Sequence, residues 1–293
     1  MNEVSGTDFG AAASEYQRGR PGYPARSASW LLGSAEVVAG SAGDGADSAV
    51  DAAVVVADVG AGTGKLTQSL VGAHRRVIAV DPDERMLAAL SVQLRGVETR
   101  PGTGESLPLE DSSVDLITYG QSWHWVDPER ACAEAARVLC PGGVLGLIWN
   151  IRDESVDWVA ELTEIITPST AEVYVASLLK DSLLKDSLLK DSLLKEQGPG
   201  CRGSADGDMG TEVSFLTADF AAPAYHCEAW ARTLSVDELV DMVASRSHTI
   251  VAAPNERQSM LSRVRALGER VRDADGSVRL PYVTHAFRAV VAG

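Results

Sequence analysis

The chain has 293 residues, enough to bury one sizeable core. Hydrophobic residues make up 45% and charged residues 23%, which excludes collagen-like, fibrous and wholly disordered classes. Lys and Arg total 26 against 41 Asp and Glu, so the formal net charge is −15. Such a surface repels phosphate backbones and anionic lipid, and we expect neither nucleic acid nor a membrane as partner.

The cysteines and the N-terminus bear on the cellular compartment. The four cysteines show no C-x-x-C pair: they are Cys132, Cys140, Cys201 and Cys227. No basic segment followed by an apolar run opens the chain, and no stretch reaches the roughly 18 apolar residues of a membrane helix. We expect a cytoplasmic protein in a reducing compartment, without a bound metal.

Strand and helix patterns alternate through the first half of the chain. A helix is predicted over 25–39, and the Gly-, Ser- and Asp-rich stretch 40–51 is typical of a flexible loop. Strands of the kind buried in parallel sheets are predicted at 54–56, 77–80, 114–119 and 144–149. Helices are predicted between them at 83–94 and 128–139, the second ending at Pro141-Gly142-Gly143. This order predicts a doubly wound α/β sheet.

The pattern changes after residue 150. A helix is predicted at 154–166, and four near-perfect copies of a five-residue unit, SLLKD, then fill 177–195. Five residues advance a helix by about 500°, so the leucine pairs rotate around the axis and form no single buried stripe. The repeat is either a partner-binding helix or a tolerated surface insertion, and the low cost of extra loop length favours the insertion. Beyond it, helices are predicted at 236–244 and 255–271 and strands at 224–230 and 279–290.

A glycine-rich turn, DVGAGTG at 58–64, follows the first predicted strand. Its three glycines let the backbone turn tightly and approach a ligand where a Cβ would clash. A P-loop is excluded because Val59 stands where its first glycine belongs and Leu66 where its hydroxyl belongs, which makes Lys65 a coincidence. In a dinucleotide G-x-G-x-x-G motif the third glycine would come one residue later, which disfavours NAD without excluding it.

Two acidic residues narrow the choice of ligand. Asp81 ends the second strand, 21 residues after Gly60, where a carboxylate can accept both hydroxyls of a ribose. Asp58 ends the first strand, where it can orient the loop and face a positive charge. A cofactor with a ribose and a cationic amino-acid moiety but no pyrophosphate is S-adenosyl-L-methionine.

Five motifs in order resemble the class I S-adenosylmethionine-dependent methyltransferases over nearly 140 residues. Four of them lie at 58–64, 77–87, 102–125 and 137–150. Within that superfamily the chain is most similar to the methyltransferase type 11 and trans-aconitate methyltransferase-like groups. Their Y-x-x-x-RP-x-YP and Q-x-x-HW patterns are matched by Tyr16, Arg20, Pro21, Tyr23 and Pro24, and by Gln121, His124 and Trp125. The resemblance implies a Rossmann-like, mostly parallel seven-stranded sheet with helices on both faces and a helical cap or insertion.

The resemblance also implies which residues contact the cofactor. They are Gly60, Ala61 and Gly62 through their backbone, Asp81 at the ribose, Pro82 and Met86 against the adenine, Gly104 and Glu105 at the adenine edge, Tyr119 and Gln121 near the methionine moiety, and Tyr16 and Arg20 in a lid. Met86 fits a helix core position equally well. Gly104 stands where the family more often has alanine.

The predicted reaction is methyl transfer by in-line displacement, in which holding the nucleophile near the methyl group supplies most of the gain. His124 is the candidate base or substrate contact, with a packed loop histidine as the alternative. Tryptophans around the site favour a small, partly hydrophobic or carboxylic-acid acceptor. Three arginines could instead bind an anionic acceptor: Arg152, Arg246 and Arg288. Isolated arginines are, however, usually solvated.

A non-catalytic S-adenosylmethionine-binding or scaffold protein, with the repeat as its interaction element, is the alternative function, ahead of an NAD-dependent oxidoreductase. We expect a single elaborated domain in four segments. Residues 1–50 form an N-terminal helical lid and linker, 51–150 the S-adenosylmethionine-binding core, 151–212 a helical insertion with the repeats, and 213–293 cap helices and C-terminal strands that complete the sheet.

Overall fold

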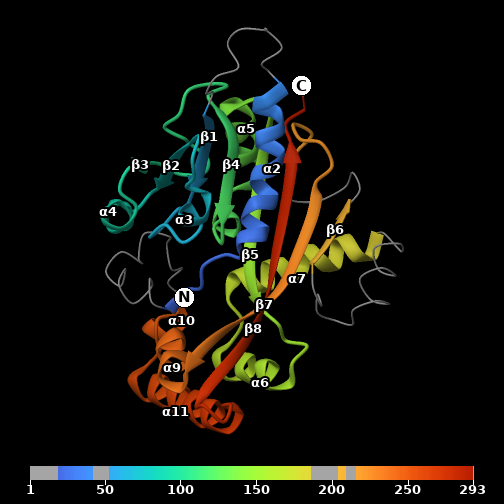
Figure 1. Cartoon of the computed structure of the whole chain (residues 1–293). Helices are drawn as coiled ribbons and strands as arrows, with labels where there is room; N and C mark the ends of the chain where they lie inside the picture. Colours follow the sequence, from blue (N-terminus) through green and yellow to red (C-terminus); the bar gives the residue numbers. More distant parts are fainter. Residues whose placement is uncertain (1–18, 42–52, 186–203, 209–215, 293) are drawn as a thin grey trace.

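The computed structural model describes residues 19–41, 53–185, 204–208 and 216–292, and one central sheet organises them (Figure 1). Across the sheet the order is β3-β2-β1-β4-β5-β8-β7-β6. The strands are β1 (Val54–Val59), β2 (Arg75–Asp81), β3 (Glu98–Pro101), β4 (Val114–Gly120), β5 (Leu139–Arg152), β6 (Ser204–Asp208), β7 (Ala224–Ser235) and β8 (Ser277–Val290). The helices are α2 (Ala25–Ser41), α3 (Thr67–Leu70), α4 (Glu84–Gln93), η2 (Trp123–Trp125), α5 (Pro128–Val138), α6 (Asp157–Ile166), α7 (Thr170–Lys185), α9 (Val236–Ala244), α10 (Ser247–Val251) and α11 (Pro254–Val271).

The strand order reverses at β1, which pairs in parallel with β2 on one side and β4 on the other. Val56 lies opposite Val77 and Leu116 in these two ladders. β3 and β5 continue the parallel part outwards, whereas β8, β7 and β6 are antiparallel. The predicted doubly wound sheet is confirmed with its seven strands, and the short β6 adds an eighth at the edge. Ligands of such sheets bind where the order reverses, at the carboxyl ends of the strands.

Both faces of the sheet are covered, as the β-branched strands require. Val56 faces α2, where Leu31 and Leu32 complete one apolar cluster. Val59, on the opposite face, belongs to the larger cluster that contains α5, Trp123 and Trp149. Alternate residues of β1 are therefore buried on opposite faces of the sheet, because successive side chains of a strand point to opposite sides.

One boundary and two short elements differ from the sequence prediction. Pro141-Gly142-Gly143 does not end a helix but lies within β5, which begins at Leu139. The reason is an irregular register: Val114 pairs with Leu139 and Leu116 with Val144, so the extra residues are accommodated as a bulge. The strand β3 and helix α10 were not predicted, because four and five residues are too few to show a period.

The first copy of the repeat is not solvent-facing throughout. It continues α7, which buries Ala171, Val175 and Leu178 on one face, with Leu178 only 4% exposed. The rotating pattern predicted no buried face, but the residues that precede the repeat supply one. Residues 186–195 lie outside the described part of the chain.

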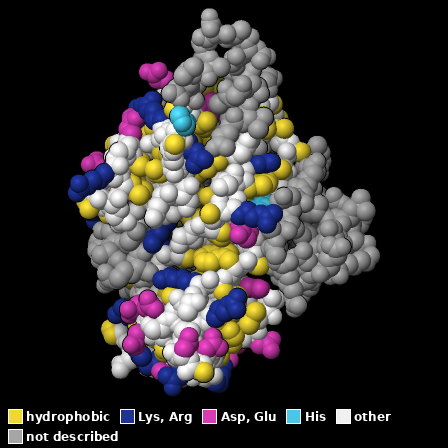
Figure 2. All heavy atoms as spheres, viewed as in Figure 1, with side chains coloured by type: hydrophobic (Ala, Val, Ile, Leu, Met, Phe, Trp, Pro, Cys, Tyr) yellow, Lys and Arg dark blue, Asp and Glu magenta, His cyan; other side chains and the backbone are white. Residues whose placement is uncertain are grey.

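A second apolar cluster joins α6, α9 and α11 to the far ends of β7 and β8, below the sheet in Figure 1. Leu162, Leu239 and Leu267 meet there with Leu280. Helix α9 begins as predicted, with a capping box in which Ser235 and Glu238 bond each other's backbone amides. On the visible face of this part, acidic and basic side chains are intermixed (Figure 2).

The cysteines differ in state. Cys132 and Cys140 are not in disulfides, whereas Cys227 on β7 is disulfide-bonded, which the cysteine spacing did not predict. Among the helices of the described residues, none combines the length and apolar character that crossing a membrane requires.

Candidate functional site

The glycine-rich turn lies at the carboxyl end of β1. Gly60, Gly62 and Gly64 all have positive φ, of 67°, 55° and 88°. A Cβ on Gly60 would stand 2.5 Å from the Cβ of Ser122, so the backbone of the turn packs closely against the loop after β4. The turn leads into α3, which has only four residues. At Gly60 any other residue would be strained and would overlap Ser122, whereas at Gly62 the backbone conformation alone favours glycine.

Asp81, the last residue of β2, holds this turn. Its Oδ2 accepts a hydrogen bond from the amide of Gly62 at 2.8 Å, and its Oδ1 accepts one from the amide of Asp83 at 2.9 Å. Burial raises the pKa of Asp81, and these two hydrogen bonds counteract the rise. A carboxylate oxygen has a second lone pair, so each oxygen can accept one more hydrogen bond. Two neighbouring hydroxyls of a ribose match that capacity.

Asp58 is buried at the end of β1, with 1% of its surface exposed. Its two oxygens accept hydrogen bonds from the hydroxyls of Thr67, at 2.6 Å, and Thr118, at 3.0 Å. Burial raises the pKa of Asp58 to about 6, despite these bonds, and the charge of Asp81 adds to the rise. At neutral pH the group is a carboxylate with little solvent around it, which favours a cationic partner.

Gln121 follows β4 in a conformation that non-glycine residues rarely adopt, with φ of 57°. Its Nε2 donates to the carbonyl of Asn150 at 2.8 Å, and its amide donates to the carbonyl of Ile148 at 2.9 Å. These bonds fix the side chain, while its Oε1 is buried and has no partner among the described residues. Backbone strain together with an unpartnered buried oxygen makes Gln121 a candidate ligand contact.

A pocket at the reversal point of the sheet brings these groups together. Of the predicted site residues, it is lined by Arg20, Asp58, Gly60, Ala61, Gly62 and Gln121. Asp81 adjoins it through its bond to Gly62. Residues of the pocket that were not predicted as cofactor contacts are Pro21, Tyr23, Thr63, Lys65, Leu66, Gly120 and Asn150.

Lys65 and Asn150 are the informative omissions. Lys65 was dismissed as a coincidence because the P-loop fails, yet it lines this pocket, and burial followed by the charge of Arg232 lowers its pKa. Asn150 could have been found from its position, because it lies near the carboxyl end of β5, at the edge where such sheets bind ligands.

The chain segment before α2 lies over this pocket. Asn150 Nδ2 donates to the carbonyl of Gly22 at 3.0 Å, and Arg232 Nη1 donates to the carbonyl of Gly19 at 2.8 Å. Arg20 and Tyr23 of this segment line the pocket. Tyr16 lies outside the described residues, so its predicted part in a lid stays a prediction.

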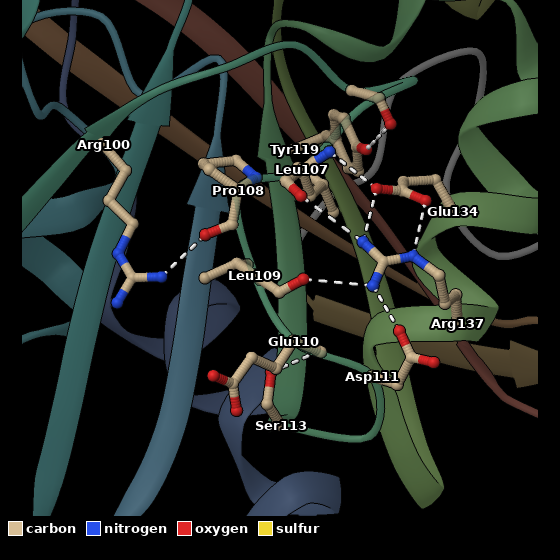
Figure 3. A network of polar contacts seen from close by, with 11 residues as sticks. Arg100, Leu107, Pro108, Leu109, Glu110, Asp111, Ser113, Tyr119, Glu134 and Arg137 are labelled. Carbon is tan, nitrogen blue, oxygen red and sulfur yellow. Dashed lines mark hydrogen bonds and ion pairs between the residues drawn. The ribbon is translucent and has the colours of Figure 1, made fainter.

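The predicted adenine-edge loop lies beyond the pocket lining and is firmly anchored (Figure 3). Arg137 on α5 forms a double hydrogen bond with Glu134 and also bonds Asp111 at 2.5 Å and the carbonyl of Leu109 at 3.1 Å. Glu134 in turn accepts from the amide of Leu107 at 2.7 Å. The loop that carries residues 104 and 105 is thus held between β3 and α5.

The remaining predicted residues surround this loop rather than the pocket. Glu105 accepts from the amide of Asp127 at 2.9 Å. Met86 is 4% exposed on α4, whereas Pro82 is exposed beside it. Gly104 allows the close approach of Tyr119, since a Cβ there would stand 3.1 Å from the phenol oxygen.

Tyr119 does not reach the pocket where the methionine moiety was expected. It is fully buried, its hydroxyl donates to the carbonyl of Gly104 at 3.4 Å, and its ring packs edge-on against Trp123. Successive side chains of a strand point to opposite faces. Thr118 faces Asp58 and Gly120 lines the pocket, so Tyr119 between them points to the other face of the sheet.

His124 lies in η2 among aromatic rings. Trp149 Nε1 donates to its Nδ1 at 3.4 Å, and the rings of Trp125 and Tyr174 lie 5.0 and 6.3 Å away between centroids. Because an indole N–H can only donate, Nδ1 is the acceptor and the proton of the neutral ring is on Nε2. Burial, followed by the charge of Arg20, lowers the pKa of His124 to about 4. This arrangement favours a neutral hydrogen-bond donor over a general base.

A Rossmann-like sheet with a glycine turn, an acidic residue after β2 and a pocket at the reversal point defines a protein that binds a nucleoside-containing cofactor. Comparison with known proteins specifies the family. A family model described as a methyltransferase domain matches residues 57–147. An uncharacterized methyltransferase of Mycobacterium tuberculosis H37Rv is 38% identical over 97% of this chain and 96% of its own. One from Schizosaccharomyces pombe is 36% identical over 55% of this chain and 59% of its own.

A solved structure described as a putative type II methyltransferase from Anaeromyxobacter dehalogenans shares the fold, with a TM-score of 0.50 and 20% identity over 93% of this chain and 97% of its own. The chain belongs to the class I S-adenosylmethionine-dependent methyltransferases, and S-adenosyl-L-methionine is its cofactor. The narrower similarity to the trans-aconitate group stays a prediction.

Proposed function

We propose that the pocket binds the amino-acid end of S-adenosyl-L-methionine and that the protein transfers the methyl group to a small, partly hydrophobic or carboxylic-acid acceptor by in-line displacement. The observation that carries the site assignment is the buried, unpartnered Oε1 of Gln121 in a pocket that also contains the carboxylate of Asp58. An oxygen acceptor and a buried negative charge suit a ligand that carries an ammonium and a sulfonium.

The residues present fit the cofactor along its length. Asp81 would accept the ribose hydroxyls, and the amides and close backbone of Gly60 to Gly62 would contact the nucleoside next to it. The anchored loop with Gly104 and Glu105 would border the adenine, with Met86 beneath it. When bound, the cofactor supplies an electrophilic methyl group and leaves as S-adenosylhomocysteine.

The chain contributes position and exclusion of water. The segment 19–24 covers the pocket. Asn150 holds both this segment and Gln121, because its Nδ2 donates to the carbonyl of Gly22 and its carbonyl accepts from Gln121 Nε2. Holding two reactants in line can supply a large part of a transfer barrier, about 7–11 kcal/mol in well-oriented cases. No general base is needed when the acceptor is already an anion.

His124 would contact the acceptor through its Nε2–H. Its Nδ1 accepts from Trp149, and its pKa near 4 leaves it neutral at physiological pH. We therefore expect His124→Asn to weaken acceptor binding more than turnover, without moving the pH profile between about 6 and 8. A base role would instead move the acidic limb of that profile.

The experiment that tests the function is transfer of a labelled methyl group. The protein is incubated with methyl-labelled S-adenosyl-L-methionine and a small-molecule extract, and both the label and S-adenosylhomocysteine are followed. We expect label in one small acceptor and an equal amount of S-adenosylhomocysteine. Saturable cofactor binding without any transfer would instead support the non-catalytic alternative.

A further inference from the structure

Three charged side chains from separate parts of the chain meet beyond the carboxyl end of β5. Arg152 Nη1 lies 2.8 Å from Glu172 Oε1, and Arg246 Nη2 lies 3.0 Å from Glu172 Oε2. Arg152 ends β5, Glu172 is on α7, and Arg246 precedes α10. The sequence offered both arginines as possible anion contacts, with solvated surface residues as the alternative, and the structure places both on one carboxylate. We call these three residues the arginine cluster.

The arginine cluster carries a surplus of positive charge away from water. The side chains of Arg152 and Glu172 are 3% and 9% exposed, and that of Arg246 is 15% exposed. Two guanidinium groups share one carboxylate, so one positive charge is uncompensated within it. The exposed Glu154 is bonded to the hydroxyl of Thr163, which also accepts from Arg152 Nη2. An uncompensated buried charge is costly unless a partner is bound.

The hydrogen-bonding capacity of the arginine cluster is also incomplete. Arg152 Nε is buried and has no partner in the described part of the chain. The polar contacts of the Arg246 guanidinium with described residues, to Glu172 and the carbonyl of Thr167, use Nη2. Burial would raise the pKa of Glu172, but the charges of both arginines and bonds from Ser169 outweigh it and hold the pKa at about 2. Glu172 is therefore a permanent counter-ion.

The arginine cluster adjoins the predicted acceptor side of the cofactor pocket. Asn150, which lines that pocket, lies two residues before Arg152 on β5 and so projects toward the same face. Tyr174, two residues after Glu172, has its ring near both His124 and Trp149. Arg20 lines the pocket. Burial lowers the pKa of Arg246, and the charges of Arg152 and Arg20 lower it further, against the opposite effect of Glu172.

We propose that Arg246 and Arg152 form a subsite for a carboxylate of the methyl acceptor, with Glu172 as a built-in counter-ion that limits its affinity. This inference rests on the proposed function and names the part of the chain that would select the acceptor. In a protein with a net charge of −15, this buried positive surplus would select an anion that the rest of the surface repels.

The test measures anion binding directly, by calorimetry on the protein with and without saturating S-adenosylhomocysteine. The probes are succinate, glutarate and benzoate, each paired with its neutral amide. We expect at least one carboxylate to bind saturably and its amide not to bind. Arg246→Met should weaken that carboxylate about tenfold or more, whereas Glu172→Gln should strengthen it, because the competing internal charge is removed.

Arg265→Met is the matched control, since Arg265 is half-exposed in a surface pair with Asp237. It should leave carboxylate binding unchanged. A purely structural role predicts that Arg246→Met and Glu172→Gln both lower the melting temperature and that neither changes carboxylate affinity, and that result would overturn the subsite. S-adenosylhomocysteine binding without any carboxylate binding overturns the subsite alone. Absence of S-adenosylhomocysteine binding overturns the proposed function, and the assignment to an acceptor falls with it.

Discussion

Replacing Asp81 should separate cofactor binding from folding. In the free protein its carboxylate accepts two backbone amides, and we propose that two ribose hydroxyls add to these. A hydrogen bond to a charged group contributes about 1.5–3 kcal/mol, so losing both ribose contacts in Asp81→Ala removes about 3–6 kcal/mol of binding free energy. That corresponds to an affinity for S-adenosylhomocysteine about 10²–10⁴-fold weaker. Asp81→Asn keeps one acceptor oxygen, so its affinity for S-adenosylhomocysteine should lie between those of the wild-type protein and Asp81→Ala.

The assay is isothermal calorimetry with S-adenosylhomocysteine, accompanied by denaturant unfolding of each variant. Asp115→Ala is the matched control, because Asp115 also accepts a backbone amide, that of Val55 at 2.8 Å, but at the opposite end of the sheet. Both variants should lose a similar amount of stability, about 1–3 kcal/mol, and only the first should lose affinity. Equal affinity in the Asp81→Ala variant and the wild-type protein would refute the ribose assignment.

Four further predictions concern the glycine turn, the titratable side chains of Asp58 and His285, and the repeat. Gly60→Ala should abolish cofactor binding and destabilise the protein by about 1–3 kcal/mol or more, since it combines positive φ with overlap on Ser122; a normal unfolding midpoint would contradict this. Affinity for S-adenosyl-L-methionine should be constant above about pH 7 and fall as pH drops through 6, because protonation of Asp58 removes the charge that faces the cofactor, and Asp58→Asn should flatten this dependence. Burial lowers the pKa of His285 to about 4, so as the pH falls this side chain takes up a proton in the unfolded protein before it does so in the folded protein. The contribution of His285 to stability is therefore complete above about pH 6.5 and should fall by about 3 kcal/mol on approach to pH 4. The loss of stability should be less steep in the His285→Gln variant. Deleting residues 186–195, two units of the repeat, should leave the affinity for S-adenosylhomocysteine unchanged; a large loss would assign the repeat to the site.

The parts of the site that the sequence predicted are those governed by backbone geometry. The glycine turn and the acidic residue after β2 depend on local spacing, and the structure joins them through the Gly62 amide and Asp81. Gln121 was placed by its motif, but its strained backbone and unpartnered oxygen are visible only when β5 supplies Asn150 as its partner.

Strand alternation and long-range packing account for what the sequence did not predict. Tyr119 was placed by motif order, yet the alternation of β4 turns it away from the pocket. Arg152 and Arg246 lie 94 positions apart, and no local pattern shows that Glu172 brings them together. The repeat was treated by itself, although the preceding turns of α7 give its first copy a buried face at Leu178.

The central claim is that the pocket at the reversal point of the sheet holds S-adenosyl-L-methionine in one orientation. The most direct measurement is a crystal structure of the complex with S-adenosylhomocysteine. We predict both ribose hydroxyls within hydrogen-bond distance of Asp81 and the amino-acid end beside Asp58 and the Oε1 of Gln121. Ligand density elsewhere in the protein, or an amino-acid end directed away from Gln121, would contradict the account.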